Sequence, residues 1–156
     1  MRIDVESLRG EKGASVSLDL VEEFLPLDLQ RSEIRFMEPL RFVGQATNTG
    51  QRIVITGYAT GRGTATCDRC LGEFTMDFHV PFAESYYRRD EAPSAVDEDE
   101  GVYDGEVIDI GPEVEKAILL SLPFRIVCKE ECRGLCPTCG KDLNLGECGC
   151  AGNDRV

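Results

Sequence analysis

The chain has 156 residues, enough for one domain with a hydrophobic core, and its apolar fraction of 42 % argues against wholesale disorder. Its formal net charge of −12 excludes a generally basic protein that coats nucleic acid, but leaves room for a local contact. No apolar run approaches the ~18 residues of a membrane span. The first residues lack an apolar signal region, so we expect a cytoplasmic protein without a membrane partner.

The first 82 residues predict a β-rich region whose strands follow one another closely and are therefore mostly antiparallel. Polar and apolar residues alternate here, as they do in strands with one buried face. The predicted strands are residues 1–5, 14–20, 40–46, 52–58, 64–67 and 73–82. The turn residues Asn48, Thr49 and Gly50 indicate a hairpin between two of them. Residues 21–35 stay ambiguous, because Pro26 interrupts a helical spacing.

An acidic run occupies residues 90–106, with eight Asp or Glu residues and no Lys or Arg. Subtracting its −8 from the formal charge of −12 leaves −4 for the rest of the chain. Like charges repel one another and this run has little to bury, so we expect an exposed, mobile loop. A short strand over 107–110 follows. A helix then begins at Gly111, with proline in its first turn, and Pro123 ends it.

These elements predict an α+β domain over residues 1–123, a mostly antiparallel sheet or partly open barrel with one main packing helix. Residues 124–156 form a tail that holds six of the eight cysteines. In the reducing compartment expected here, clustered cysteines bind metal or do redox chemistry more often than they form disulfides. The segment Cys136-Pro-Thr-Cys139-Gly140 has the spacing of a zinc knuckle, so we predict a small zinc-binding module. Iron is the second candidate, because thiolates suit both metals.

Two ligand sets for this metal remain open. In the first, Cys128, Cys132, Cys136 and Cys139 make one compact site and the last two cysteines are spare. In the second, Cys136, Cys139, Cys148 and Cys150 close a small ribbon, and Cys128 and Cys132 pair with Cys67 and Cys70 in a second site. We prefer the first set slightly, because it needs no long-range contact. The second set has the merit that it uses all eight sulfurs.

The segment Cys67-Asp68-Arg69-Cys70 lies at the predicted bend between two strands and has three interpretations. It is half of a metal site, a structural thiol pair, or a dithiol redox centre. A thioredoxin-type redox motif opens a helix, whereas a strand follows here, so the redox interpretation is the least favoured. His79 is the only histidine, and no matched Cys or Ser motif makes it a catalytic base. We therefore expect neither an enzyme nor a small-molecule substrate.

Four segments occur in a characteristic order along the chain. They are Cys67-Asp68-Arg69-Cys70-Leu71 with Phe74, then Val107-Ile108-Asp109-Ile110, the helix ending at Leu122-Pro123, and the tail from Cys128 to Asn144. In the tail, the run Cys132-Arg-Gly-Leu-Cys136-Pro-x-Cys139-Gly140 is the most specific part. This combination resembles the YceD family, the large ribosomal RNA subunit accumulation proteins. The likeness covers most of the chain, and the N-terminal third matches only in its β-rich character.

The resemblance implies a ribosome-biogenesis factor that supports accumulation of 23S ribosomal RNA by binding RNA or a ribosomal protein. Basic residues interleaved with the cysteines are the candidates for contact with RNA phosphate. They are Arg69, Arg125, Lys129, Arg133 and Lys141. Their alternative role is to offset the net charge of about −2 of a zinc ion held by four thiolates. Two rival functions are a dithiol redox protein using Cys67 and Cys70, and an acidic adaptor that holds a basic ribosomal protein.

Overall fold

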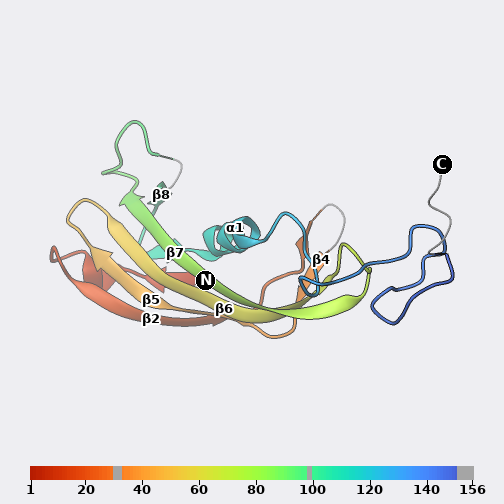
Figure 1. Ribbon diagram of the computed structural model, residues 1–156. Coiled ribbons are helices and arrows are strands. Elements are labelled where there is room, and N and C mark those ends of the chain that lie inside the picture. The colour runs from red at the N-terminus through yellow and green to blue at the C-terminus, as the bar shows by residue number, and fades with distance from the viewer. Residues whose placement is uncertain (30–32, 98–99, 151–156) are drawn as a thin grey trace.

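One long hairpin organises the computed structural model, which describes residues 1–29, 33–97 and 100–150 (Figure 1). Its arms are β6 (Ile53–Thr66) and β7 (Glu73–Arg88), and the whole length of β6 pairs antiparallel with β7. The other edge of β6 pairs with β5 (Leu40–Asn48) and, near its end, with β4 (Glu33–Phe36). The remaining strands are β1 (Arg2–Asp4), β2 (Ser15–Glu22), β3 (Leu27–Asp28), β8 (Glu100–Tyr103) and β9 (Val107–Asp109).

The mostly antiparallel sheet predicted from the sequence is confirmed, and it is an open curved sheet, not a closed barrel. The prediction was wrong in one detail, because the separate strands predicted over 52–58 and 64–67 are replaced by one continuous strand, β6, over 53–66. The glycines between them stay extended. The ambiguous residues 21–35 hold the end of β2 together with β3 and the start of β4, a short antiparallel pair, whereas residues 30–32 lie outside the described residues.

The packing helix is also confirmed, as α1 (Gly111–Ser121). Pro112 lies in its first turn, and the chain turns away at Leu122, before Pro123. Val114 and Ile118 are fully buried in the same hydrophobic core as Phe42 of the sheet. In Figure 1 the helix lies on the concave side of the sheet. A residue pattern with one apolar stripe therefore produces a helix that covers one face of the sheet.

The acidic run 90–106 is the exposed loop that its charge predicts in one part only: Asp90, Glu91 and Asp97 are exposed and lie outside the strands. Residues 100–103 form β8, which pairs parallel to the end of β7. Arginines from neighbouring elements pair with its carboxylates. The pairs are Arg9–Glu106, Arg52–Glu100, Arg88–Asp90 and Arg89–Asp104. These cations offset the repulsion among the carboxylates of the run. Residues 98 and 99 of the run lie outside the described residues.

Within the described ranges, no helix combines the length and the apolar content that crossing a bilayer requires. The two ends of the molecule carry different segments of the chain. Strand β8 and the acidic run lie at one end, and the β6–β7 bend and the cysteine-rich tail lie at the other (Figure 1). The long hairpin thus carries its bend, with Cys67 and Cys70, away from the acidic run and toward the tail.

Candidate metal centres

The β6–β7 bend has the backbone conformation of a metal knuckle. The N–H of Leu71 donates to the carbonyl oxygen of Cys67 at 2.9 Å, and the N–H of Cys67 donates to that of Gly72 at 2.9 Å. Leu71 adopts φ +57°, a left-handed conformation that a leucine reaches at a cost of about 1–2 kcal/mol. A non-glycine residue in this conformation shows that the tight turn is imposed by its surroundings. The side chain of Leu71 is 65 % exposed.

The tail repeats this conformation at its own knuckle. The N–H of Gly140 donates to the carbonyl oxygen of Cys136 at 2.9 Å, and Gly140 has φ +72°. Leu71 and Gly140 therefore occupy equivalent positions, four residues after the first cysteine of each pair. Glycine is the residue expected at a left-handed position, so Gly140 indicates the turn in the sequence, whereas Leu71 gives no such indication at the bend. Both pairs share the Cys-x-x-Cys spacing, and this spacing is the sequence signal for the metal half-site that was one of the three interpretations of the Cys67–Cys70 segment.

The tail is held against the bend by hydrogen bonds in both directions. Asp68 donates its N–H to the carbonyl oxygen of Ile126 at 2.8 Å, and its carboxylate accepts from the N–H of Ile126 at 2.7 Å. The Arg69 guanidinium donates to the carbonyl oxygens of Glu130 and Cys132, at 2.9 and 3.1 Å. These contacts bring Cys128 and Cys132 beside Cys67 and Cys70, although 58 residues separate Cys70 from Cys128 along the chain.

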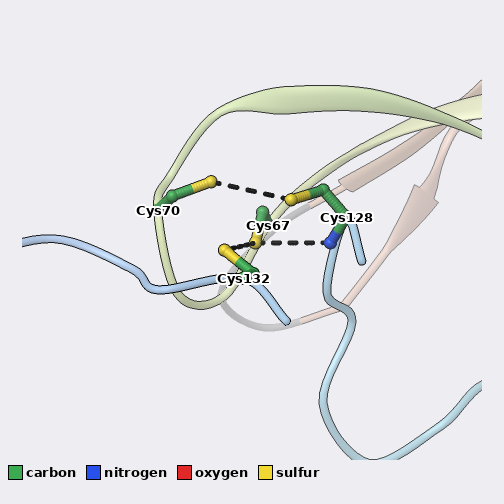
Figure 2. A group of neighbouring side chains, drawn as sticks. All are labelled: Cys67, Cys70, Cys128 and Cys132. Carbon is green, nitrogen blue, oxygen red and sulfur yellow. Dashed lines mark hydrogen bonds between the residues drawn. The ribbon is translucent and has the colours of Figure 1, made fainter. Parts of the chain in front are cut away.

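Four sulfurs converge at this contact, and we call them the bend cluster: Cys67, Cys70, Cys128 and Cys132 (Figure 2). The Sγ atoms of Cys67 and Cys132 are 3.8 Å apart, and those of Cys70 and Cys128 are 3.9 Å apart. A tetrahedral ion with Zn–S bonds of about 2.3 Å has sulfur–sulfur edges of about 3.8 Å. Cys67 and Cys132 are 0 % and 4 % exposed, so the site is largely shielded from solvent. The bend cluster fits one tetrahedral metal ion.

A second group of four lies further along the tail, and we call it the tail cluster: Cys136, Cys139, Cys148 and Cys150. Its sulfurs all lie within 4.8 Å of one another, as do those of the bend cluster. A short β-bridge between Leu135 and Asp142 closes the ribbon that carries the knuckle. Cys139 is exposed, and the two last cysteines are half-buried. The tail cluster is therefore the more accessible of the two candidate sites.

The first cysteine of each knuckle has a lowered pKa. Burial by itself raises the pKa of Cys67, but backbone N–H groups of Cys128 and Cys70 outweigh it and lower that pKa to about 6. Backbone N–H groups of Cys139 and Thr138 likewise lower the pKa of Cys136 to about 6.

Other thiols in the two clusters shift in the opposite direction. Burial, followed by the neighbouring thiols, raises the pKa of Cys128 to about 12. The thiol of Cys139, with burial, raises the pKa of Cys150 to about 12. Four thiolates this close repel one another, and a divalent cation removes that cost by binding them all. All eight cysteines are free thiols, so each is available as a ligand.

The structure divides the preferred ligand set of the sequence analysis between two clusters. Cys128 and Cys132 lie in the bend cluster, whereas Cys136 and Cys139 lie in the tail cluster. The sulfurs are grouped as in the alternative two-site set, with Cys148 and Cys150 as ligand candidates and no spare cysteine. The compact site was preferred because it needs no contact between distant parts of the chain. The long hairpin provides that contact, since it places its bend beside the tail.

The five basic candidates for RNA contact have different surroundings. Arg69 donates to the carbonyl oxygens of Glu130 and Cys132, so its guanidinium binds the tail to the bend. Arg133 lies 3.8 Å from a carboxylate oxygen of Glu147, and Lys141 donates to the Glu147 carbonyl oxygen at 2.7 Å. In the part of the chain that the structure describes, the side chains of Arg125 and Lys129 make no hydrogen bond or ion pair. Those two are the candidates with a free charged group.

Comparison with known proteins adds a family to this geometry. The model of a family described as "Large ribosomal RNA subunit accumulation protein YceD" matches residues 55–155, a range that contains all eight cysteines. The chain is 30 % identical over 148 residues to an uncharacterized protein of Mycobacterium tuberculosis, covering 92 % of this chain and 70 % of that protein. It is 28 % identical over 132 residues to the uncharacterized protein YlbN of Bacillus subtilis, covering 84 % and 76 %. No solved structure matches this chain significantly.

Proposed function

Because the chain belongs to the YceD family, which is named for accumulation of the large ribosomal RNA, we propose that it is a ribosome-biogenesis factor. In this proposal it supports accumulation of 23S ribosomal RNA as a binding protein without catalytic activity. The observation that carries the proposal is the family match over both cysteine clusters. Each cluster holds a structural zinc ion, since four thiolates in a tetrahedral arrangement suit zinc. The ions fix the bend and the tail as one rigid end of the molecule.

Several contacts support binding in preference to redox catalysis. The sulfur of Cys67 is buried and shares its cluster with three other cysteines, whereas a redox dithiol needs an accessible thiolate. His79 stacks on the ring of Tyr58, with the ring centroids 4.8 Å apart. It lies six residues along β7 from Glu73 at the bend, a distance of about 20 Å in a strand. The only histidine is thus far from the reactive sulfurs.

The adaptor alternative has less support than the charge of the chain suggests. Four carboxylates of the acidic run already contact arginines, so the run offers fewer free charges to a basic partner. A partner that binds there would have to displace those arginines or use the remaining acids. We therefore place the binding surface at the other end of the molecule, next to the bend cluster.

A groove of ≈ 790 Å³ lies between the end of α1 and the bend. Its lining includes Leu71, Leu119, Leu122, Pro123, Phe124 and Arg125. The ring of Phe124 is fully exposed, at 101 %, and the guanidinium next to it has no partner in the described chain. An exposed aromatic ring beside free cations can stack a base and bind the adjoining phosphates. We propose that this groove receives a single-stranded segment of the ribosomal RNA, with Lys129 as a second phosphate contact.

Depletion of the protein in its host cell is expected to lower 23S rRNA and mature large subunits while 16S rRNA is maintained. The reason is that the proposed factor acts on the large subunit alone. Quantification of both RNAs and sucrose-gradient profiles of ribosomal particles measure the effect. A depleted strain with normal 23S rRNA and normal large subunits would contradict the proposed function.

Phe124→Ser combined with Arg125→Gln is expected to weaken binding of single-stranded RNA at least about fivefold. Loss of one stacked base costs about 1–3 kcal/mol, and about 1.4 kcal/mol corresponds to a factor of ten. The measurement is fluorescence anisotropy with a labelled 12-nucleotide oligouridine, at two salt concentrations. The matched control is Arg41→Gln, which removes an exposed arginine that already pairs with Asp19 in the sheet.

Two results would contradict the proposal that the groove binds single-stranded RNA. One is equal RNA affinity of the double variant, the Arg41→Gln control and the wild type. The other is crosslinking in cells that attaches a ribosomal protein, and no RNA, to the wild-type groove. The second result would assign the groove to a protein partner and would leave the role in 23S rRNA accumulation standing.

A further inference from the structure

The two clusters are joined by a short stretch of backbone pairing. Cys132 of the bend cluster and Cys136 of the tail cluster lie four residues apart, on either side of Gly134 and Leu135. The N–H of Leu135 donates to the carbonyl oxygen of Arg69 at 3.1 Å, and the carbonyl oxygen of Gly134 accepts from the N–H of Leu143 at 2.9 Å. This stretch therefore touches the bend on one side and the loop of the tail cluster on the other.

Asn144 extends that connection to a sulfur atom. Its Nδ2 atom lies 3.4 Å from the Sγ atom of Cys132, as a donor, and its Oδ1 atom accepts from the N–H of Arg133 at 2.9 Å. Asp142 fixes the side chain from the other direction, because its carboxylate accepts from both nitrogens of Asn144, at 2.8 and 2.7 Å. A residue in the loop between the two halves of the tail cluster thus donates a hydrogen bond to a ligand of the bend cluster.

We infer that Asn144 is a positioning residue of the bend site and couples the affinities of the two metal sites. The inference rests on the proposed metal sites. Asn144 lies between Cys139 and Cys148, so a metal ion bound by the tail cluster holds its loop in place. An N–H donor to a thiolate stabilises the charged ligand and offsets the net charge of about −2 of a four-thiolate zinc site. Metal in the tail cluster therefore raises the affinity of the bend cluster, and the effect is reciprocal.

The test compares zinc retention by the full chain against a chelator, with alkylation of cysteines followed by peptide mass spectrometry. Cys67 and Cys70 report the bend site, whereas Cys148 and Cys150 report the tail site. We expect Asn144→Ala to weaken zinc retention at the bend site by about 10–100-fold, the usual effect of losing an outer-shell partner. Asn144→Asp is expected to weaken it as well, because a carboxylate cannot donate to the sulfur. The matched control, Leu145→Ala, removes an exposed neighbour in the same loop and leaves retention unchanged.

The coupling itself is tested by a double-mutant cycle. Cys139→Ser removes the tail site and is expected to weaken the bend site in the wild-type background but not in the Asn144→Ala background. Equal bend-site retention in Asn144→Ala and wild type would overturn the role of Asn144. An equal effect of Cys139→Ser in both backgrounds would overturn the coupling. A wild-type chain that retains no zinc at Cys67 and Cys70 would instead remove the metal proposal on which both depend.

Discussion

The purified protein is expected to contain two zinc ions per chain, and removal of both is expected to unfold the tail while the sheet persists. The tail has few alternatives to the metal for its stability, because Ile126 is the one apolar residue after Pro123 that joins the hydrophobic core of the described chain. Structural zinc contributes about 10–16 kcal/mol of apparent binding free energy in small modules, and that energy becomes folding energy where no other core exists. The sheet and α1 supply nearly all of the hydrophobic core, so we expect them to stay folded without the ions.

Metal analysis of the folded chain and hydrogen exchange with and without a chelator measure this result. Residues 124–150 are expected to lose protection on chelation, more than β5, β6 and β7 do. Cys132→Ser and Cys139→Ser form a matched pair, each removing one sulfur from a different cluster. The first is expected to expose Cys67 and release the tail from the bend, whereas the second leaves the contacts of Asp68 with Ile126 in place. One ion per folded chain, or a tail whose exchange is the same with and without zinc, would contradict the two-site arrangement.

The elements that the sequence predicted correctly are those set by local chemistry. The helix follows from an apolar stripe with Pro112 at its start and Pro123 beyond its end, and these signals need no partner. The alternation in residues 14–20 and 73–82 similarly places strands, since one face of each is buried. The knuckle at Cys136 was visible because Gly140 follows it.

The features that the sequence could not predict depend on partners far along the chain. Residues 100–103 of the acidic run form a strand, and Arg52 of the turn before β6 and Arg89 after β7 supply counter-charges to Glu100 and Asp104. The ligand grouping depends on the long hairpin, which brings Cys67 to Cys132 across 65 positions. Asn144 belongs to the tail segment that carries the family resemblance, but its hydrogen bond to Cys132 could not be predicted, because an amide donor to a sulfur is recognised only once the two clusters are placed. Spacing therefore identifies a metal knuckle, whereas the pairing of knuckles is a property of the fold.

Gly57→Val is expected to destabilise the whole sheet by at least about 3 kcal/mol, because a side chain at this residue would clash with the backbone of β5. Gly57 of β6 lies opposite Gly44 of β5. A Cβ atom at Gly57 would lie 2.4 Å from the carbonyl oxygen of Val43 and 2.7 Å from the Cα atom of Gly44. It would also lie 2.9 Å from the ring of Phe42, which is fully buried. Backbone atoms cannot move aside as a flexible side chain does, so β5 and β6 must separate.

Urea unfolding followed by circular dichroism measures the loss, with Thr56→Val as the matched control. Thr56 is the preceding residue of β6, its side chain is exposed, and the exchange retains a β-branched side chain, so a change within about 0.5 kcal/mol is expected. About 30 Å of strand separates Gly57 from Cys67 at the bend. The variant is therefore expected to bind two zinc ions at low temperature despite its weaker sheet. A Gly57→Val protein as stable as the Thr56→Val control would show that the two glycines are not in close contact across the strands.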